Sequence, residues 1–162
     1  MRWFFDTEFD DNGRTIDLIS IALVSEAGEE YSACLHDGWY PELCDAWIVA
    51  NVLPKLPLDE ERKTRIQVAR EIRLVVGEKP EFWGYYADYD WVALCQLYGK
   101  MIDIPSGWPL FCRDLKQLIV DREVSKETLP RQMQGSKHDA LADARWVRDA
   151  WLFIRSTGIR GG

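Results

Sequence analysis

Long apolar segments are missing from this sequence of 162 residues. No run approaches the ~20 apolar residues that a membrane-spanning helix needs, so we expect no membrane contact. At the N-terminus, Asp6 and Glu8 follow only a short apolar stretch, which is too early for the apolar region of a signal peptide. These absences predict a cytoplasmic protein.

The sequence also has few possible zinc ligands and no excess of basic residues. The four cysteines show no Cys-x-x-Cys spacing, and the chain has only two histidines, so a zinc site has few possible ligands. The formal net charge of −7 argues against nucleic-acid binding through a broad basic surface. Nucleic-acid chemistry is still allowed, because a carboxylate cluster that holds divalent cations presents positive charge to a phosphate.

The composition, 47% hydrophobic and 29% charged, is typical of a globular protein, and we expect a single domain over residues 1–162. Apolar runs at residues 3–5, 16–24 and 30–35 predict three strands. Asp10-Asp11-Asn12-Gly13 supplies the turn chemistry of a hairpin between the first two. The chain therefore opens with an antiparallel meander.

The pattern then alternates between helix and strand. We predict a helix over 59–76 with Asp59 as its N-cap, a strand over 81–86, a helix over 90–98, a strand over 110–112, and helices over 115–120 and 139–154. This order predicts an α/β fold with a mixed central sheet, an antiparallel meander followed by parallel strands, flanked by helices. Residues 41–57 give no clear pattern.

The first unusual feature is a pair of acids, Asp6 and Glu8, at the end of an otherwise apolar strand. Because side chains alternate along a strand, both carboxylates point to one face and Thr7 points to the other. Such a pair repels unless it is protonated or shares a cation, and its oxygens suit Mg²⁺ or Mn²⁺. Taken alone, the pair is more often a solvated strand end. The spacing does not fit the calcium loop of an EF-hand. If Gly13 is the sixth residue of the loop, Ile19 stands at the twelfth position, where a glutamate is required.

Two further acidic sites lie beside predicted helices. Asp88-Tyr89-Asp90 follows an aromatic strand at the start of a helix, where an aspartate commonly serves as a cap. Near the C-terminus, His138 precedes a helix with Asp143 in its second turn, and helical spacing would set the two side chains roughly 140° apart. They can therefore flank one site. Taken alone, this histidine is more often a cap or a surface residue.

The three sites in this order are more informative than any one of them. They lie in Phe5-Asp6-Thr7-Glu8-Phe9, Tyr85-Tyr86-Ala87-Asp88-Tyr89-Asp90-Trp91-Val92-Ala93-Leu94 and His138-Asp139-Ala140-Leu141-Ala142-Asp143. Over nearly its whole length the sequence resembles the DEDDh, or DnaQ-like, 3′-to-5′ exonucleases, and within them it is similar to the small stand-alone bacterial and phage exoribonucleases. The resemblance implies a ribonuclease H-like fold and release of nucleoside 5′-monophosphates from a 3′ end.

The resemblance also implies the role of each residue in the site. It makes Asp6, Glu8, Asp90 and Asp143 the ligands of two Mg²⁺ or Mn²⁺ ions, with Asp6 as the natural bridging ligand. It makes His138 the general base, and a histidine with its ordinary pKa near ~6.5 can accept a proton at neutral pH.

The chain departs from the family's pattern in the second motif. Tyr85-Tyr86 stands where relatives often have His-Asn, and Asp88 competes with Asp90 for the ligand role. We favour Asp90, because it follows an aromatic residue and begins the apolar helix that the motif normally precedes.

Single-stranded RNA, or an RNA 3′ overhang, is the expected substrate, since bases of any sequence can stack on aromatic side chains. Thr7 and Phe9 are the candidates for substrate contact, although a core position suits Phe9 equally well. Further aromatic candidates, which the sequence does not rank, are Trp39, Trp47 and Trp108. The segment before His138 has three basic residues that can either meet the RNA backbone or belong to a solvated loop: Lys126, Arg131 and Lys137.

Three other interpretations remain open. The same residues fit a DNA exonuclease, because the motifs hold a phosphodiester and say nothing firm about the 2′-hydroxyl. A catalytically silent nucleic-acid-binding module on this fold is the second, although the five filled catalytic positions and the negative net charge argue against it. A structural cation-binding protein is the third, and it would leave His138 without a role. The eight tryptophans leave room for an aromatic homodimer interface.

Overall fold

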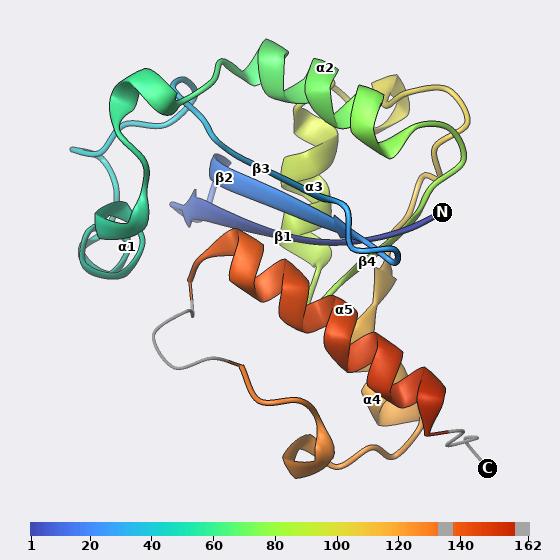
Figure 1. Ribbon diagram of the computed structural model, residues 1–162. Coiled ribbons are helices and arrows are strands. Elements are labelled where there is room, and N and C mark those ends of the chain that lie inside the picture. The colour runs from blue at the N-terminus through green and yellow to red at the C-terminus, as the bar shows by residue number, and fades with distance from the viewer. Residues whose placement is uncertain (133–137, 158–162) are drawn as a thin grey trace.

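The computed structural model describes residues 1–132 and 138–157. At its centre is a five-stranded sheet in the order β3-β2-β1-β4-β5, with helices on both faces (Figure 1). The strands β1 (Arg2–Asp11), β2 (Ile16–Ser25) and β3 (Glu30–Cys34) form an antiparallel meander. β4 (Glu81–Gly84) is parallel to β1, and β5 (Arg113–Asp114) is parallel to β4. The predicted mixed sheet is confirmed.

Five α-helices surround the sheet: α1 (Ala46–Asn51), α2 (Arg65–Val76), α3 (Asp88–Gln96), α4 (Leu115–Asp121) and α5 (Ala140–Ser156). α2 and α3 lie over one face, and α4 and α5 lie over the other (Figure 1). In the part of the chain that is described, no helix has the length and apolar character to cross a membrane.

The alternation of side chains along β1 decides which residues reach each face. Trp3 and Phe5 are fully buried in the core under α2 and α3, whereas Phe4 is buried in the core under α4 and α5. The same alternation carries Asp6 and Glu8 to the α5 face and Thr7 to the α3 face. Asp6 and Glu8 therefore lie on the opposite face of β1 from Thr7, the residue between them in the sequence.

Two predicted boundaries were wrong: the start of the helix over 59–76 and the position of the strand over 110–112. The helix predicted over 59–76 begins at Arg65, because Thr64 and Gln67 form a reciprocal capping box. Asp59, the predicted cap, lies in a separate 3₁₀ turn, and the chain between is held extended by a bridge from Lys63 to Leu35. The strand predicted over 110–112 lies instead at Arg113–Asp114, where the backbone pairs with β4.

The acidic pair does not end its strand as predicted, because β1 continues to Asp11. The pairing with β2 is shifted between Glu8 and Phe9, which marks a bulge immediately after the pair. Regular alternation therefore holds up to the second acid and is interrupted just beyond it.

Close packing positions α3 and α5 against β1. A Cβ at Gly84 would lie 2.5 Å from the Cβ of Ala87, so only glycine permits the tight turn from β4 into α3. On the other face, Ala140 and Ala144 of α5 pack against Ala22 and Val24 of β2. Small side chains let this helix approach the sheet beside the acids of β1.

Candidate active site

Three carboxylates converge beside β1. One oxygen each from Asp6, Glu8 and Asp143 lies within 4.8 Å of the other two. β1 presents its two acids on the face that α5 covers, and Asp143 lies in the first turn of α5. Asp139 caps this helix by accepting hydrogen bonds from the backbone N–H groups of Leu141 and Ala142, so the cap and the acid of the cluster are different residues.

The fourth predicted acid reaches the same pocket from α3. Asp90 is buried and lines a cavity of about 350 Å³ together with Asp6, Glu8 and Asp143. Its Oδ1 accepts hydrogen bonds from the Thr7 backbone N–H at 3.0 Å and from the Thr7 hydroxyl at 2.5 Å. Asp88 is exposed on the outside of the same turn. Burial therefore distinguishes the two aspartates that competed in the sequence.

Burial and mutual repulsion make these acids hard to ionise. Burial, followed by repulsion from Asp90, Asp143 and Glu8, raises the pKa of Asp6 well above its ordinary value. Burial and then repulsion from Asp143 raise the pKa of Glu8 to about 8. Burial also raises the pKa of Asp143 and of Asp90 to about 6.

The cluster fits a divalent cation. Asp143 Oδ1 is buried, and among the described residues it has no hydrogen-bond partner. A buried carboxylate oxygen without a donor, facing two more carboxylates, is costly unless a cation takes the donor's place. Oxygen-only ligands of this kind suit Mg²⁺ or Mn²⁺.

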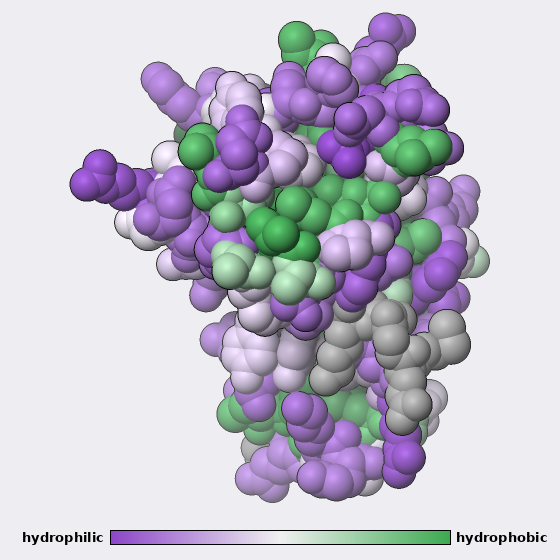
Figure 2. Space-filling view, turned by 90° about the vertical axis from the view of Figure 1, so that its left-hand side faces the viewer, coloured by the Kyte–Doolittle hydropathy of each residue, from purple (hydrophilic) through white to green (hydrophobic). Residues whose placement is uncertain are grey.

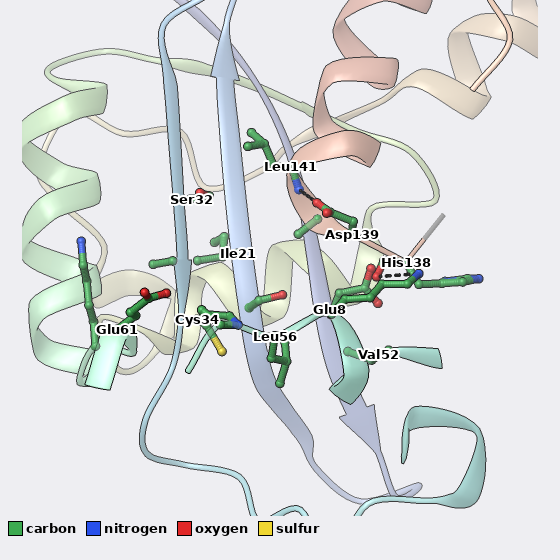
Figure 3. Close-up of a pocket in the computed structure, with 16 residues that line it drawn as sticks. Glu8, Ile21, Ser32, Cys34, Val52, Leu56, Glu61, His138, Asp139 and Leu141 are labelled. Atoms are coloured by element: carbon green, nitrogen blue, oxygen red, sulfur yellow. Dashed lines mark hydrogen bonds between the residues drawn. The ribbon is translucent and has the colours of Figure 1, made fainter. Parts of the chain in front are cut away.

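His138 lies next to the acids and is held by its backbone as well as its ring. It has a positive φ of 62°, so it lies outside the helix, and its N–H donates to Asp143 Oδ2 at 3.1 Å. Its ring meets the Trp47 ring edge-on, with centroids 4.6 Å apart. Figure 3 shows Glu8 and His138 side by side at one end of a neighbouring pocket.

The aromatic candidates separate by position. Phe9 is half-buried, lines the 350 Å³ cavity and contacts the Tyr89 ring at 5.9 Å between centroids. Trp47 lines the same cavity and is 48% exposed. Trp39 and Trp108 are buried in the core and do not line this cavity. Apolar side chains also gather on the surface on the side of the molecule that carries α1 (Figure 2).

Sequence reasoning missed Lys55, which lies in a 3₁₀ turn at Leu53–Lys55. Its Nζ donates to the His138 backbone oxygen at 3.4 Å. Its charge also lowers the pKa of Glu8 and of Asp143, partly offsetting the repulsion among the acids. No signal could have found it, because residues 41–57 carry no readable pattern.

The raised pKa of Glu8 leads to a prediction about the protein without metal. An ordinary glutamate ionises near pH 4.5 and Glu8 near pH 8, so the folded state binds more protons and loses stability as pH rises through that range. In EDTA at pH 8, Glu8→Gln should therefore melt above the wild type, and a relief of ~1–2 kcal/mol corresponds to about 2–8 °C.

The difference should shrink toward pH 5, and Mn²⁺ should stabilise the wild type more than the variant. Differential scanning fluorimetry across pH, with and without Mn²⁺, measures both effects. A variant that melts below the wild type in EDTA at pH 8 would show that Glu8 is held by favourable contacts instead.

Comparison with known sequences gives a consistent result. Residues 57–155 match the model of the 3′–5′ exoribonuclease Rv2179c-like domain. The chain is 39% identical over 168 residues to the 3′–5′ exoribonuclease Rv2179c of Mycobacterium tuberculosis H37Rv, an alignment that covers 99% of this chain and 97% of the relative. The 3′–5′ exoribonuclease MT2234.1 of M. tuberculosis CDC 1551 matches with the same identity and coverage.

Comparison with solved structures supports the fold. Exonuclease I of Methylocaldum szegediense superposes with a TM-score of 0.65 at 17% identity, covering 97% of this chain and 40% of that one. E. coli exonuclease I in complex with a dA16 oligonucleotide gives a TM-score of 0.62 at 17% identity, with 96% and 40% covered. The chain thus spans about two fifths of these proteins, which have a ribonuclease H-like fold, and the predicted fold is confirmed.

Proposed function

The chain belongs to the Rv2179c-like 3′–5′ exoribonuclease family, and from this premise we propose that it shortens single-stranded RNA from the 3′ end, using two divalent cations and releasing nucleoside 5′-monophosphates. One observation carries the proposal. The carboxylates of Asp6, Glu8 and Asp143 meet within 4.8 Å, with Asp90 on the same cavity and His138 beside them.

The four acids would hold the cations, with Asp6 shared between them. When bound, the cations supply charge that stabilises the attacking and leaving oxygens of a phosphodiester. Without them the site repels a phosphate, because four carboxylates face one cavity. Metal binding therefore reverses the sign of the charge that the substrate meets.

His138 is the general base of the proposed reaction. It lines the cavity with all four acids, and the hydrogen bond from its backbone N–H to Asp143 fixes it relative to them. Contact with the Trp47 ring restricts rotation of the His138 ring. Its role is to take the proton of the attacking water.

Thr7, predicted as a substrate contact, is better explained as a positioning residue. Both its backbone N–H and its hydroxyl bond Asp90 Oδ1, and its side chain is buried. With Oδ1 held by Thr7, the other oxygen of Asp90 is the one available to a cation. Thr7 thus fixes the orientation of Asp90 across the face of β1.

The terminal nucleotide would occupy the 350 Å³ cavity. Phe9 and Trp47 line it beside the acids, and aromatic side chains of this kind provide stacking surfaces for a base of any sequence. The preference for RNA over DNA in this proposal rests on the named relatives.

The experiment that tests this function is incubation of matched 5′-labelled RNA and DNA strands with Mg²⁺, Mn²⁺ or EDTA, with products resolved at single-nucleotide steps. The expected result is a metal-dependent ladder that shortens from the 3′ end of RNA and releases 5′-monophosphates. Faster shortening of the DNA would favour a DNA exonuclease. No shortening of either strand would favour a silent binding module.

A matched pair of variants tests the choice between the two aspartates of the second motif. Asp90→Asn should abolish the ladder, and Asp88→Asn should leave it intact, because only Asp90 is buried on the cavity. Loss of activity in Asp88→Asn alone would reverse the assignment.

A further inference from the structure

A second pocket opens from the same acids on the side of α5 that faces α4. Its volume is about 690 Å³, and it shares Asp6, His138 and Asp143 with the carboxylate cluster. The rest of its lining comes from residues 126–132 and from the region where β4 meets α5, notably Tyr85, Lys126, Leu129, Pro130, Arg131 and Trp146. We call it the basic-aromatic pocket.

Aromatic rings form one wall of the basic-aromatic pocket. The Tyr85 and Trp146 rings meet edge-on with centroids 5.0 Å apart, and the Trp146 indole N–H donates to the Pro130 backbone oxygen at 2.8 Å. Tyr86 extends this group outward: its ring lies 4.7 Å from Tyr85, and the residue is 62% exposed. Tyr86 also has a positive φ of 55°, an uncommon conformation for a bulky residue. Tyr86 therefore lies next to the lining of the pocket, with its ring open to solvent.

Two basic side chains also line the pocket. Lys126 and Arg131 are exposed, and within residues 1–132 and 138–157 neither has a carboxylate within ion-pair distance. Glu127 adds one carboxylate to this lining, beside the two cations. The two cations suit phosphates, which nucleic-acid-binding proteins neutralise with lysine and arginine.

The remaining pocket beside the acids lacks these features. It has a volume of about 400 Å³ and, within residues 1–132 and 138–157, no aromatic side chain but His138 in its lining. Glu61 and Asp139 contribute carboxylates to it (Figure 3). Lys63, one of its two lysines, is paired with Glu71 at 2.6 Å. Among the described residues, this pocket therefore offers a base no phenol or indole ring, and one of its two lysines is already paired.

The direction in which the RNA strand lies across the site follows from the number of nucleotides on each side of the scissile phosphate. An exonuclease that starts at a 3′ end needs room for one nucleotide beyond the scissile phosphate, and a continuing track for the rest of the strand. The smaller cavity with Phe9 and Trp47 suits the single nucleotide. The larger pocket, on the other side of the acids, suits the strand.

Resting on the proposed exoribonuclease function, we propose that the basic-aromatic pocket binds the nucleotides on the 5′ side of the scissile phosphate. Their bases stack on the Tyr85 and Tyr86 rings, and their phosphates lie at Lys126 and Arg131. The pocket thereby sets how affinity grows with RNA length.

The test compares an eight-nucleotide RNA with a dinucleotide, which has a single phosphodiester. In Lys126→Ala/Arg131→Ala, KM for the octamer should rise about tenfold, and the salt dependence should weaken by about 1.4 in the slope of log KM against log[salt], as expected for two lost phosphate contacts on a single strand. KM for the dinucleotide should rise much less. Tyr86→Asn should also raise KM for the octamer, because it removes the ring at an exposed site whose positive φ asparagine tolerates.

The matched control is Arg70→Ala/Arg73→Ala, which removes the same charge from exposed positions on α2, over the other face of the sheet. It should leave both KM values unchanged. An equal rise for dinucleotide and octamer in Lys126→Ala/Arg131→Ala, or no rise for either, would overturn the proposal.

Binding separates this proposal from the proposed function. Fluorescence anisotropy of a labelled octamer on the Asp6→Asn protein reports affinity without hydrolysis. If Lys126→Ala/Arg131→Ala in the Asp6→Asn protein weakens octamer binding, the proposed role of the basic-aromatic pocket is supported, even if no ladder is ever seen. Unchanged binding refutes that role, even if the wild type is an active exoribonuclease.

Discussion

Asp6→Asn is expected to lower kcat for RNA hydrolysis by at least ~10³-fold, since loss of even one electrostatic contact to a transition state costs about 10²–10³. Asp6 is repelled by the other three acids, and one of its oxygens lies within 4.8 Å of an oxygen of Glu8 and an oxygen of Asp143. Asparagine has the same shape but no charge and only one oxygen, so it cannot serve two cations. Single-turnover rates on 5′-labelled RNA in saturating Mg²⁺ or Mn²⁺ measure the loss.

Stability measurements show whether that loss is local. Because its pKa is raised in the fold, ionised Asp6 destabilises the metal-free protein at neutral pH, so Asp6→Asn should melt no lower than the wild type in EDTA. Mn²⁺ should raise the melting temperature of the wild type and much less that of the variant. A rate close to that of the wild type in Asp6→Asn would remove Asp6 from the catalytic site.

His138→Asn is expected to lower kcat by ~10²–10⁴, the usual contribution of a general base. Asparagine is the appropriate replacement because it tolerates the positive φ of this position, where alanine would add backbone strain. It also keeps the backbone N–H that bonds Asp143. The metal site should therefore survive, and the rise in melting temperature on adding Mn²⁺ should be retained.

The chain offers a matched control for this substitution in its only other histidine, His36, which is exposed in the bend that follows β3. His36→Asn should keep the wild-type rate. If His138→Asn also kept it, or if it lost the response to Mn²⁺, His138 would not be a general base acting separately from the metal ligands.

How far the sequence could predict the site depends on how local each feature is. Asp6 and Glu8 share a face because alternation along a strand is a property of a few adjacent residues. The position of His138 was harder to predict. Its positive φ places it outside the helix, so the angle expected between the side chains of two helical residues did not apply to His138 and Asp143. Its partner Trp47 lies in a stretch with no readable pattern.

Boundaries failed where a distant strand or a short-range competitor decided the conformation. Thr64 capped α2 in place of Asp59 because Lys63 is held extended by its bridge to Leu35. The apolar residues 110–112 did not form the strand, since β4 pairs with Arg113–Asp114 and thereby fixes the register. Neither effect is visible in local propensity.

The sequence by itself determined the order of the strands and helices apart from α1, the candidate acids and the motifs that link the chain to its family, because periodicity and spacing are encoded locally. Only the tertiary structure decided that Asp90 and not Asp88 faces the cluster, that Thr7 holds it, and that Lys126 and Arg131 border a pocket continuous with Asp6. Each of these depends on burial or on contact between segments far apart in the chain, and such contacts arise when the helices pack on the sheet.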